Sequence, residues 1–156
     1  MIRFYHLTRS PVETALARLL SRAFEAGHRT EVRGTDRDRL DWLDRKLWLG
    51  PDDGFLPHGL AGGPHDARQP ILLTERSELA DNTTCLMVVD GAEIDAAETK
   101  QLERTCILFD GGDAAALDRA RDQWRALTGA GLGAEYWSEE SGQWKLKTSA
   151  PPQTNA

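Results

Sequence analysis

The sequence predicts an α/β fold: a three-layer Rossmann-like sandwich with a mainly parallel central sheet and without a nucleotide-binding fingerprint. Residues 70–74 and 85–89 are continuous apolar runs, which suit parallel strands covered by helices on both faces. Segments with helical spacing of apolar residues alternate along the chain with these and other strand-like runs. The 156 residues are expected to form one domain at 1–147 and a disordered tail at 148–156.

Turn and capping residues define the first elements. Residues 2–7 are expected to form the opening strand. A helix should follow, with Ser10 as its N-cap, Pro11 in its first turn and Gly27 as its C-terminal stop. Residues 30–33 are a short, weak strand candidate. The chain therefore opens in the alternating order that the fold class requires.

A second helix is expected to begin at Thr35, its N-cap. Leucines at helical spacing make its buried stripe: Leu40, Leu43 and Leu47. Trp42 should lie on roughly the opposite side, and Trp48 should flank the stripe. The remaining expected elements are a short helix at 95–102, a buried strand at 104–109, a helix at 113–128, and a terminal hairpin that pairs 134–137 with 143–147.

Composition limits the partners that the chain can have. A net charge of −6 argues against broad affinity for nucleic acid, which needs Lys and Arg to replace phosphate counterions. Residues 1–30, however, carry five Arg against two Glu, so a bound anion would need a local basic pocket. Cys85 and Cys106 lie in strand-like runs and are expected to be buried thiols. With no apolar run of ~18–20 residues and no export signal, the sequence predicts a cytoplasmic protein without membrane contact.

Motifs for catalysis, cofactors and metals are absent from the sequence. Neither a phosphate-binding loop nor a dinucleotide fingerprint follows any expected strand, so no cofactor is expected. His58 and His65, with Asp66, are the best metal candidates, but the pattern is weak and no metal site is predicted. One alternative stays open: a small α/β nucleotide-binding or hydrolase domain, whose ligand pocket would lie at the C-terminal ends of the strands.

Two stretches remain as candidate binding surfaces. On the last helix, Arg121 and Arg125 are neighbours on one face beside Trp124. They are either a site for an anionic partner or one side of a solvated ion-pair face, since acidic residues precede each by three positions. The other stretch is a loop around 50–60 with unusually apolar side chains, which either covers the edge of the core or awaits a partner.

The loop also carries a resemblance to a known family. Leu47-Trp48, followed by Phe55-Leu56-Pro57-His58-Gly59-Leu60-Ala61-Gly62, resembles the chi subunit of bacterial DNA polymerase III holoenzyme, in which a helix ending in Leu-Trp leads to Phe-Val-Pro-His-x-Leu-Ala-Gly. The resemblance extends from the opening strand to the helix at 113–128. It implies the same α/β fold and a non-catalytic accessory subunit of the replicase, active in DNA replication and implicated in DNA repair.

The resemblance also implies two binding sites. Arg121, Trp124 and Arg125 match the helix that takes the acidic C-terminal tail of single-stranded-DNA-binding protein, which ends in Pro-Phe, and Phe109 matches a position near its slot. Leu117 stands where the family has a basic residue. The second site, for the psi subunit of the clamp-loader assembly or an iron-sulfur helicase, comprises Trp48, Phe55, Leu56, Pro57 and His58. Little direct DNA binding is expected.

Overall fold

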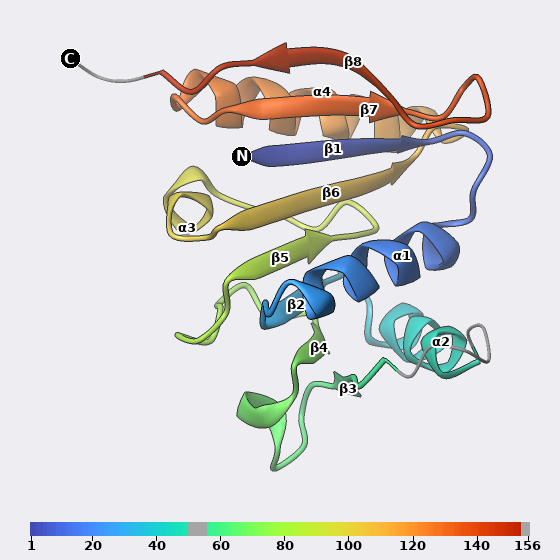
Figure 1. The fold of residues 1–156 in the computed structure, drawn as a ribbon, viewed down its shortest axis with the longest axis vertical. Helices are drawn as coiled ribbons and strands as arrows, with labels where there is room; N and C mark the ends of the chain where they lie inside the picture. Colours follow the sequence, from blue (N-terminus) through green and yellow to red (C-terminus); the bar gives the residue numbers. More distant parts are fainter. Residues whose placement is uncertain (50–55, 154–156) are drawn as a thin grey trace.

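The computed structural model describes residues 1–49 and 56–153. Its strands form one twisted sheet (Figure 1). They are β1 (Ile2–Leu7), β2 (Thr30–Arg33), β3 (Gly59–Leu60), β4 (Ile71–Thr74), β5 (Cys85–Val88), β6 (Arg104–Asp110), β7 (Ala134–Ser138) and β8 (Lys145–Ala150). Within the described part of the chain their order is β3-β4-β2-β5-β6-β1-β7-β8. Every neighbouring pair is parallel except β7 and β8, which are antiparallel.

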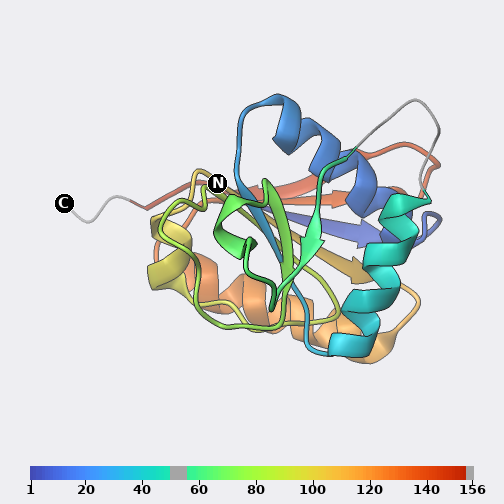
Figure 2. The same ribbon diagram turned by 90° about the horizontal axis from the view of Figure 1, so that it is seen from below.

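Helices cover both faces of this sheet (Figure 2). They are α1 (Val12–Glu25), α2 (Arg37–Trp48), α3 (Ala96–Lys100) and α4 (Ala114–Gly129), with a short 3-10 turn, η1 (Asp66–Arg68). The helices α1 and α2 share one hydrophobic core with the sheet, and α3 and α4 share the other. The predicted three-layer α/β class with a mainly parallel sheet is therefore confirmed.

Side-chain alternation along β1 explains how one strand serves both cores. Ile2 and Phe4 point toward α4, whereas Leu7 belongs to the core beneath α1. The leucine stripe expected on α2 is buried. The thiols of Cys85 and Cys106 are buried and free, as predicted.

Three local expectations need correction. Ser10 does not cap α1, because the N-cap is Pro11 and the Ser10 hydroxyl donates instead to Glu139 Oε2 at 2.8 Å. The N-cap of α2 is Asp36, not Thr35, and its carboxylate accepts the Asp38 amide. Residues 148–150 belong to β8 rather than to a disordered tail, because they pair with β7.

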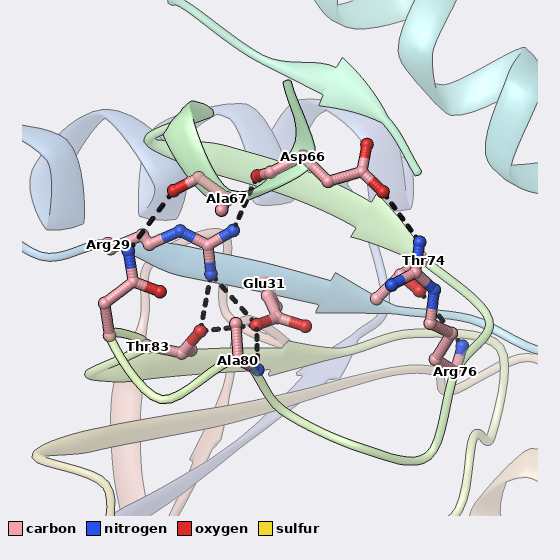
Figure 3. Close-up of polar contacts among 9 residues, drawn as sticks. Arg29, Glu31, Asp66, Ala67, Thr74, Arg76, Ala80 and Thr83 are labelled. Atoms are coloured by element: carbon pink, nitrogen blue, oxygen red, sulfur yellow. Dashed lines mark hydrogen bonds and ion pairs between the residues drawn. The ribbon is translucent and has the colours of Figure 1, made fainter. Parts of the chain in front are cut away.

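A polar network joins β2 to the two segments that flank β4 (Figure 3). Arg29 Nη1 donates to Glu31 Oε2 at 3.0 Å and to Thr83 Oγ1 at 2.6 Å, while its Nη2 donates to the Asp66 carbonyl at 2.9 Å. The same Glu31 oxygen accepts the Thr83 hydroxyl and the Ala80 amide, the latter at 3.0 Å. Because both members of the ion pair are almost fully buried, this network links three loops through one desolvated charge pair.

Glu139, just after β7, is the carboxylate that holds the β1–α1 connection. Its Oε1 accepts three consecutive backbone amides, those of Thr8, Arg9 and Ser10, at 3.1, 2.9 and 2.6 Å. Burial alone would raise the pKa of Glu139, but these donors and the Ser10 hydroxyl outweigh it and the pKa is lowered. The carboxylate therefore satisfies amides that would otherwise be orphaned near the uncapped start of α1.

We expect Glu139→Gln to destabilise the domain by about 2 kcal/mol at pH 7, because charge-assisted hydrogen bonds exceed neutral ones. The pKa of the folded state lies below the reference value of 4.5. The contribution of the carboxylate is therefore fully present above that value and is lost as the pH falls through the folded-state pKa. Urea unfolding should show a constant gap from pH 7 to about 5.5 that shrinks below about pH 4.

Glu140→Gln is the matched control, because Glu140 is exposed and its contact with Lys147 is 3.8 Å long. Its effect should stay within about 0.5 kcal/mol. Equal losses for the two variants, or a gap for Glu139→Gln that does not change with pH, would contradict this role of the carboxylate.

Candidate functional site

Arg121, Trp124 and Arg125 lie together on α4, with both guanidinium groups exposed. Arg121 Nη1 is 3.7 Å from Asp118 Oδ1, and these two side chains are 66% and 77% exposed. Arg125 and Asp122 form no ion pair with any residue that the structure describes. A single long, solvated contact contributes little to stability. The structure therefore favours a face with available positive charge over a closed ion-pair face.

Trp124 belongs to a group of packed rings that we call the aromatic cluster: Phe4, His6, Phe109, Trp124 and Tyr136. Trp124 meets Phe4 edge to face with 5.3 Å between ring centroids. His6 stacks on Phe109 at 5.1 Å, and the Tyr136 hydroxyl oxygen lies 2.8 Å from His6 Nδ1. Phe4 and Phe109 are buried, whereas the other three rings are half-buried. The cluster thus combines buried apolar rings with accessible ring edges on the same side of the sheet as α4.

The electrostatics of the aromatic cluster place Arg121 close to it. Burial lowers the pKa of His6, the charge of Glu140 opposes this, and Arg121 lowers it further. Burial raises the pKa of Tyr136, and Arg121 partly offsets that rise. Because a cation disfavours a second positive charge nearby, the uncharged form of His6 is favoured and the positive charge of this surface stays on the arginines.

Sequence reasoning selected Phe109, Arg121, Trp124 and Arg125 but missed His6 and Tyr136. The structure brings them together because β1 pairs with β6 and β7 in parallel, which aligns His6 with Phe109 and Phe4 with Tyr136. The two-residue period of β1, which places Phe4 and His6 on one face, was a signal for His6. Leu117 packs against the core of this face, so it adds no charge to the site.

A second surface lies at the end of α2. Trp48 is 52% exposed and Leu49 is 78% exposed. The Trp48 ring lies over the ring of His58, with centroids 4.1 Å apart. Leu56 and Pro57 are half-buried, and Phe55 lies outside the described residues. An exposed tryptophan held against a fixed ring is typical of an anchor for a protein partner.

His58 has a supporting place in this surface. Its side chain is fully buried, with Nδ1 2.7 Å from the Leu56 carbonyl oxygen and Nε2 3.1 Å from the Asp44 carbonyl oxygen. Burial raises the pKa of Asp44, and nearby His58 lowers it. These contacts fix the imidazole against α2, so His58 positions the Trp48 ring from beneath rather than presenting itself to solvent.

The glycine-rich loop that follows is closed by its own carboxylate. Asp66 accepts the amides of Gly62 and Gly63 at 2.9 and 3.0 Å, and Arg76 Nη2 donates to the same carboxylate at 2.6 Å (Figure 3 draws the Arg76 contact). The Gly62 and Gly63 amides therefore already have an acceptor within the loop and are not available to bind a phosphate group. The hydrogen bond from the Gly62 amide, together with those from Arg76 and Gly63, outweighs the opposing effect of burial and lowers the pKa of Asp66.

A cavity of about 640 Å³ lies at the C-terminal ends of β1 and β6. The chain leaves β1 toward β2 and leaves β6 toward β7, on opposite sides, so this is the point where open α/β sheets bind ligands. Here the nearby loop amides are donated to Glu139, and Arg39 is paired with Asp90 at 3.2 Å. The described residues that line it include hydroxyl and carboxylate side chains, among them Ser10, Glu13 and Asp110, but no histidine, cysteine, lysine or tyrosine. The Ser10 hydroxyl is already donated to Glu139.

Residues 1–49 and 56–153 contain no group of three or more His, Cys, Asp or Glu side chains placed to hold a metal ion. None of the helices in that part of the chain is long and apolar enough to cross a bilayer.

Comparison with known proteins gives the family. Residues 1–135 match the family described as DNA polymerase III chi subunit, HolC. The chain is 26% identical over 90 residues to the "Probable DNA polymerase III subunit chi" of Rickettsia prowazekii (strain Madrid E), covering 58% of this chain and 54% of that protein. It is 28% identical over 95 residues to the "DNA polymerase III subunit chi" of Escherichia coli (strain K12), covering 51% of this chain and 65% of that protein.

The chain thus spans less than two-thirds of the length of either relative. The family match itself covers most of the chain, from β1 to the start of β7, and includes both candidate surfaces apart from Tyr136. The chain belongs to the DNA polymerase III chi subunit family.

Proposed function

We propose that the chain is a non-catalytic accessory subunit of the bacterial replicase that holds the C-terminal tail of single-stranded-DNA-binding protein on α4. The observation that carries this proposal is the pair of exposed guanidinium groups on α4, one of which, that of Arg121, lies close to the aromatic cluster. A tail that ends in a carboxylate and an apolar ring needs both features at once: forked donors for the carboxylate and a slot for the ring.

The Trp48 surface would hold the second partner, either a psi subunit that leads to the clamp loader or an iron-sulfur helicase in repair. Two features support separate partners. α2 and α4 belong to different cores, so the two surfaces lie on different sides of the sheet (Figure 2). One surface is cationic, whereas the other offers exposed apolar side chains, Trp48 and Leu49. Such a bridging protein would work in the cytoplasm, where the replicase acts.

The tail should bind with an affinity on the order of micromolar, about −8 kcal/mol, because a flexible peptide must be ordered on binding. Leu117, in place of a basic residue, removes one source of attraction. Isothermal titration should compare the full tail peptide with one that lacks the terminal Phe. We expect the truncated peptide to bind at least tenfold more weakly, since it leaves the apolar slot unfilled.

Arg121→Lys tests the charged half of the same contact. An ammonium group cannot reproduce the two-pronged hydrogen bonds of guanidinium with a carboxylate, so this variant should also bind more weakly. If the tail peptides with and without the terminal Phe bind with equal affinity, the aromatic cluster does not bind the terminal ring.

A further inference from the structure

An additional pocket lies between α1 and the C-terminal hairpin, on the side of the sheet opposite α4. It encloses about 340 Å³ and is formed by Tyr5 of β1, by Arg18 and Arg22 of α1, and by Trp137 and Trp144 of the hairpin. In Figure 1, α1 lies over the part of the sheet around β5 and β2, and no helix of the described chain lies over β7 and β8 on this side. We call it the arginine–tryptophan pocket.

Its rings are held in place and remain accessible. Trp144 meets Tyr5 edge to face with 5.4 Å between ring centroids. Trp137 Nε1 donates to Glu135 Oε1 at 3.4 Å, and both tryptophans are half-buried. Leu146, the cross-strand partner of Trp137, is 46% exposed. Fixed rings that stay open to solvent are suited to stacking against another flat ring.

The charge of the pocket is positive. Arg3 Nε is 3.1 Å from Glu135 Oε1, but Arg18 and Arg22 form no ion pair with any residue in the described ranges 1–49 and 56–153. Arg18 and Arg22 are four residues apart on α1, so they project side by side along one wall of the pocket. The pocket therefore contains three of the five arginines of residues 1–30, and one of them, Arg3, is paired with a carboxylate, that of Glu135.

We propose that the arginine–tryptophan pocket binds single-stranded nucleic acid, with bases stacked on Trp137 and Trp144 and phosphates held by Arg18 and Arg22. Aromatic platforms beside a basic wall are the combination that binds such strands without sequence preference, because every base offers a flat face. An acidic peptide could use the arginines, but side chains that are not aromatic would leave both indoles unused. The composition is consistent with weak binding. The net charge of −6 limits the affinity of the chain for nucleic acid, and a local basic pocket permits some binding.

This inference goes beyond the proposed function and does not rest on it, because the pocket and α4 share no residue. Binding should be weak and should depend strongly on salt. For single strands, log K falls with log salt by about 0.7 per phosphate contact, so two arginine contacts predict a slope contribution near −1.4.

The test is an anisotropy titration of a short fluorescent oligothymidylate at low salt, into the full chain and its variants. The double variant Arg18→Glu, Arg22→Glu should lose at least tenfold in affinity and show a shallower salt slope. Trp144→Ala should lose roughly tenfold with an unchanged slope, whereas Trp144→Phe should keep most of the binding. Quenching of tryptophan fluorescence in the wild type should follow the same titration curve.

The matched control is the double variant Arg121→Glu, Arg125→Glu, which makes the same charge change on α4 and should bind the oligonucleotide like the wild type. Unfolding curves of all variants identify any that lose affinity by misfolding, and the exposed arginines of α1 should leave folding intact. Equal binding by the wild type and Arg18→Glu, Arg22→Glu, or no binding by either at low salt, would overturn the proposal. So would an acidic peptide without aromatic residues that displaces the oligonucleotide from this pocket.

Discussion

Replacing Glu31 with alanine is expected to destabilise the domain by about 3–5 kcal/mol. The substitution leaves the guanidinium of Arg29 in a buried position without its carboxylate, and it removes the acceptor of the Thr83 hydroxyl and the Ala80 amide. Most of the cost comes from this uncompensated charge rather than from the lost attraction. Urea unfolding followed by circular dichroism measures it directly.

Two controls separate a buried charge from a general effect of charge removal. Arg76→Ala breaks the exposed ion pair with Asp66 and should cost less than about 1 kcal/mol. The double variant Arg29→Met, Glu31→Leu should cost much less than Glu31→Ala, because no charge is left unpaired. A loss under about 1 kcal/mol for Glu31→Ala would mean that water reaches the network and that the pair is not desolvated.

The second large effect concerns Trp48. Trp48→Ala is expected to weaken binding of the psi subunit or the helicase by about 2 kcal/mol or more, roughly 30-fold. The indole is half-exposed and rests on the fixed ring of His58, so a partner that covers it gains a large apolar area from a side chain with few rotatable bonds. The stability of the free domain should change little. Surface plasmon resonance with each purified partner measures the loss.

His58→Ala should weaken the same interaction through the position of Trp48, and it should also lower stability, because the ring fills a buried site between α2 and the loop. The charge reversals on α4 should leave this binding unchanged. If Trp48→Ala instead unfolds the domain, Trp48 is a packing residue and the surface is not an anchor.

Local pattern was sufficient to predict much of the fold. The apolar runs of β4 and β5, the leucine stripe of α2 and the start of α4 near residue 113 each depend on residues close together in the sequence. The features that local pattern did not predict depend on contacts between residues far apart in the sequence. Glu31 and Arg33 made β2 look weak, yet both are buried, because Arg29 pairs with the first and Glu98, at 2.5 Å, with the second.

The same reason explains the errors at the sites and caps. Ser10 has the pattern of an N-cap, but a carboxylate 129 residues away takes its hydroxyl and its amide. The two unpredicted rings of the aromatic cluster, those of His6 and Tyr136, meet only because β1 and β7 are neighbours in the sheet. The arginine–tryptophan pocket likewise joins α1 to a hairpin near the end of the chain. Spacing along the sequence can show which residues share a face of one strand, but it does not show which distant segments come into contact.

The most direct measurement of the proposed function is a titration of the fluorescent tail peptide of single-stranded-DNA-binding protein into the wild type and two double variants. The account predicts binding on the order of micromolar by the wild type, weakened by added salt. Arg121→Glu, Arg125→Glu should lose roughly 100-fold, because repulsion adds to the lost hydrogen bonds. Arg18→Glu, Arg22→Glu, with the same charge change elsewhere, should bind like the wild type. Equal binding by all three proteins would contradict the account and leave the α4 face as a solvated surface.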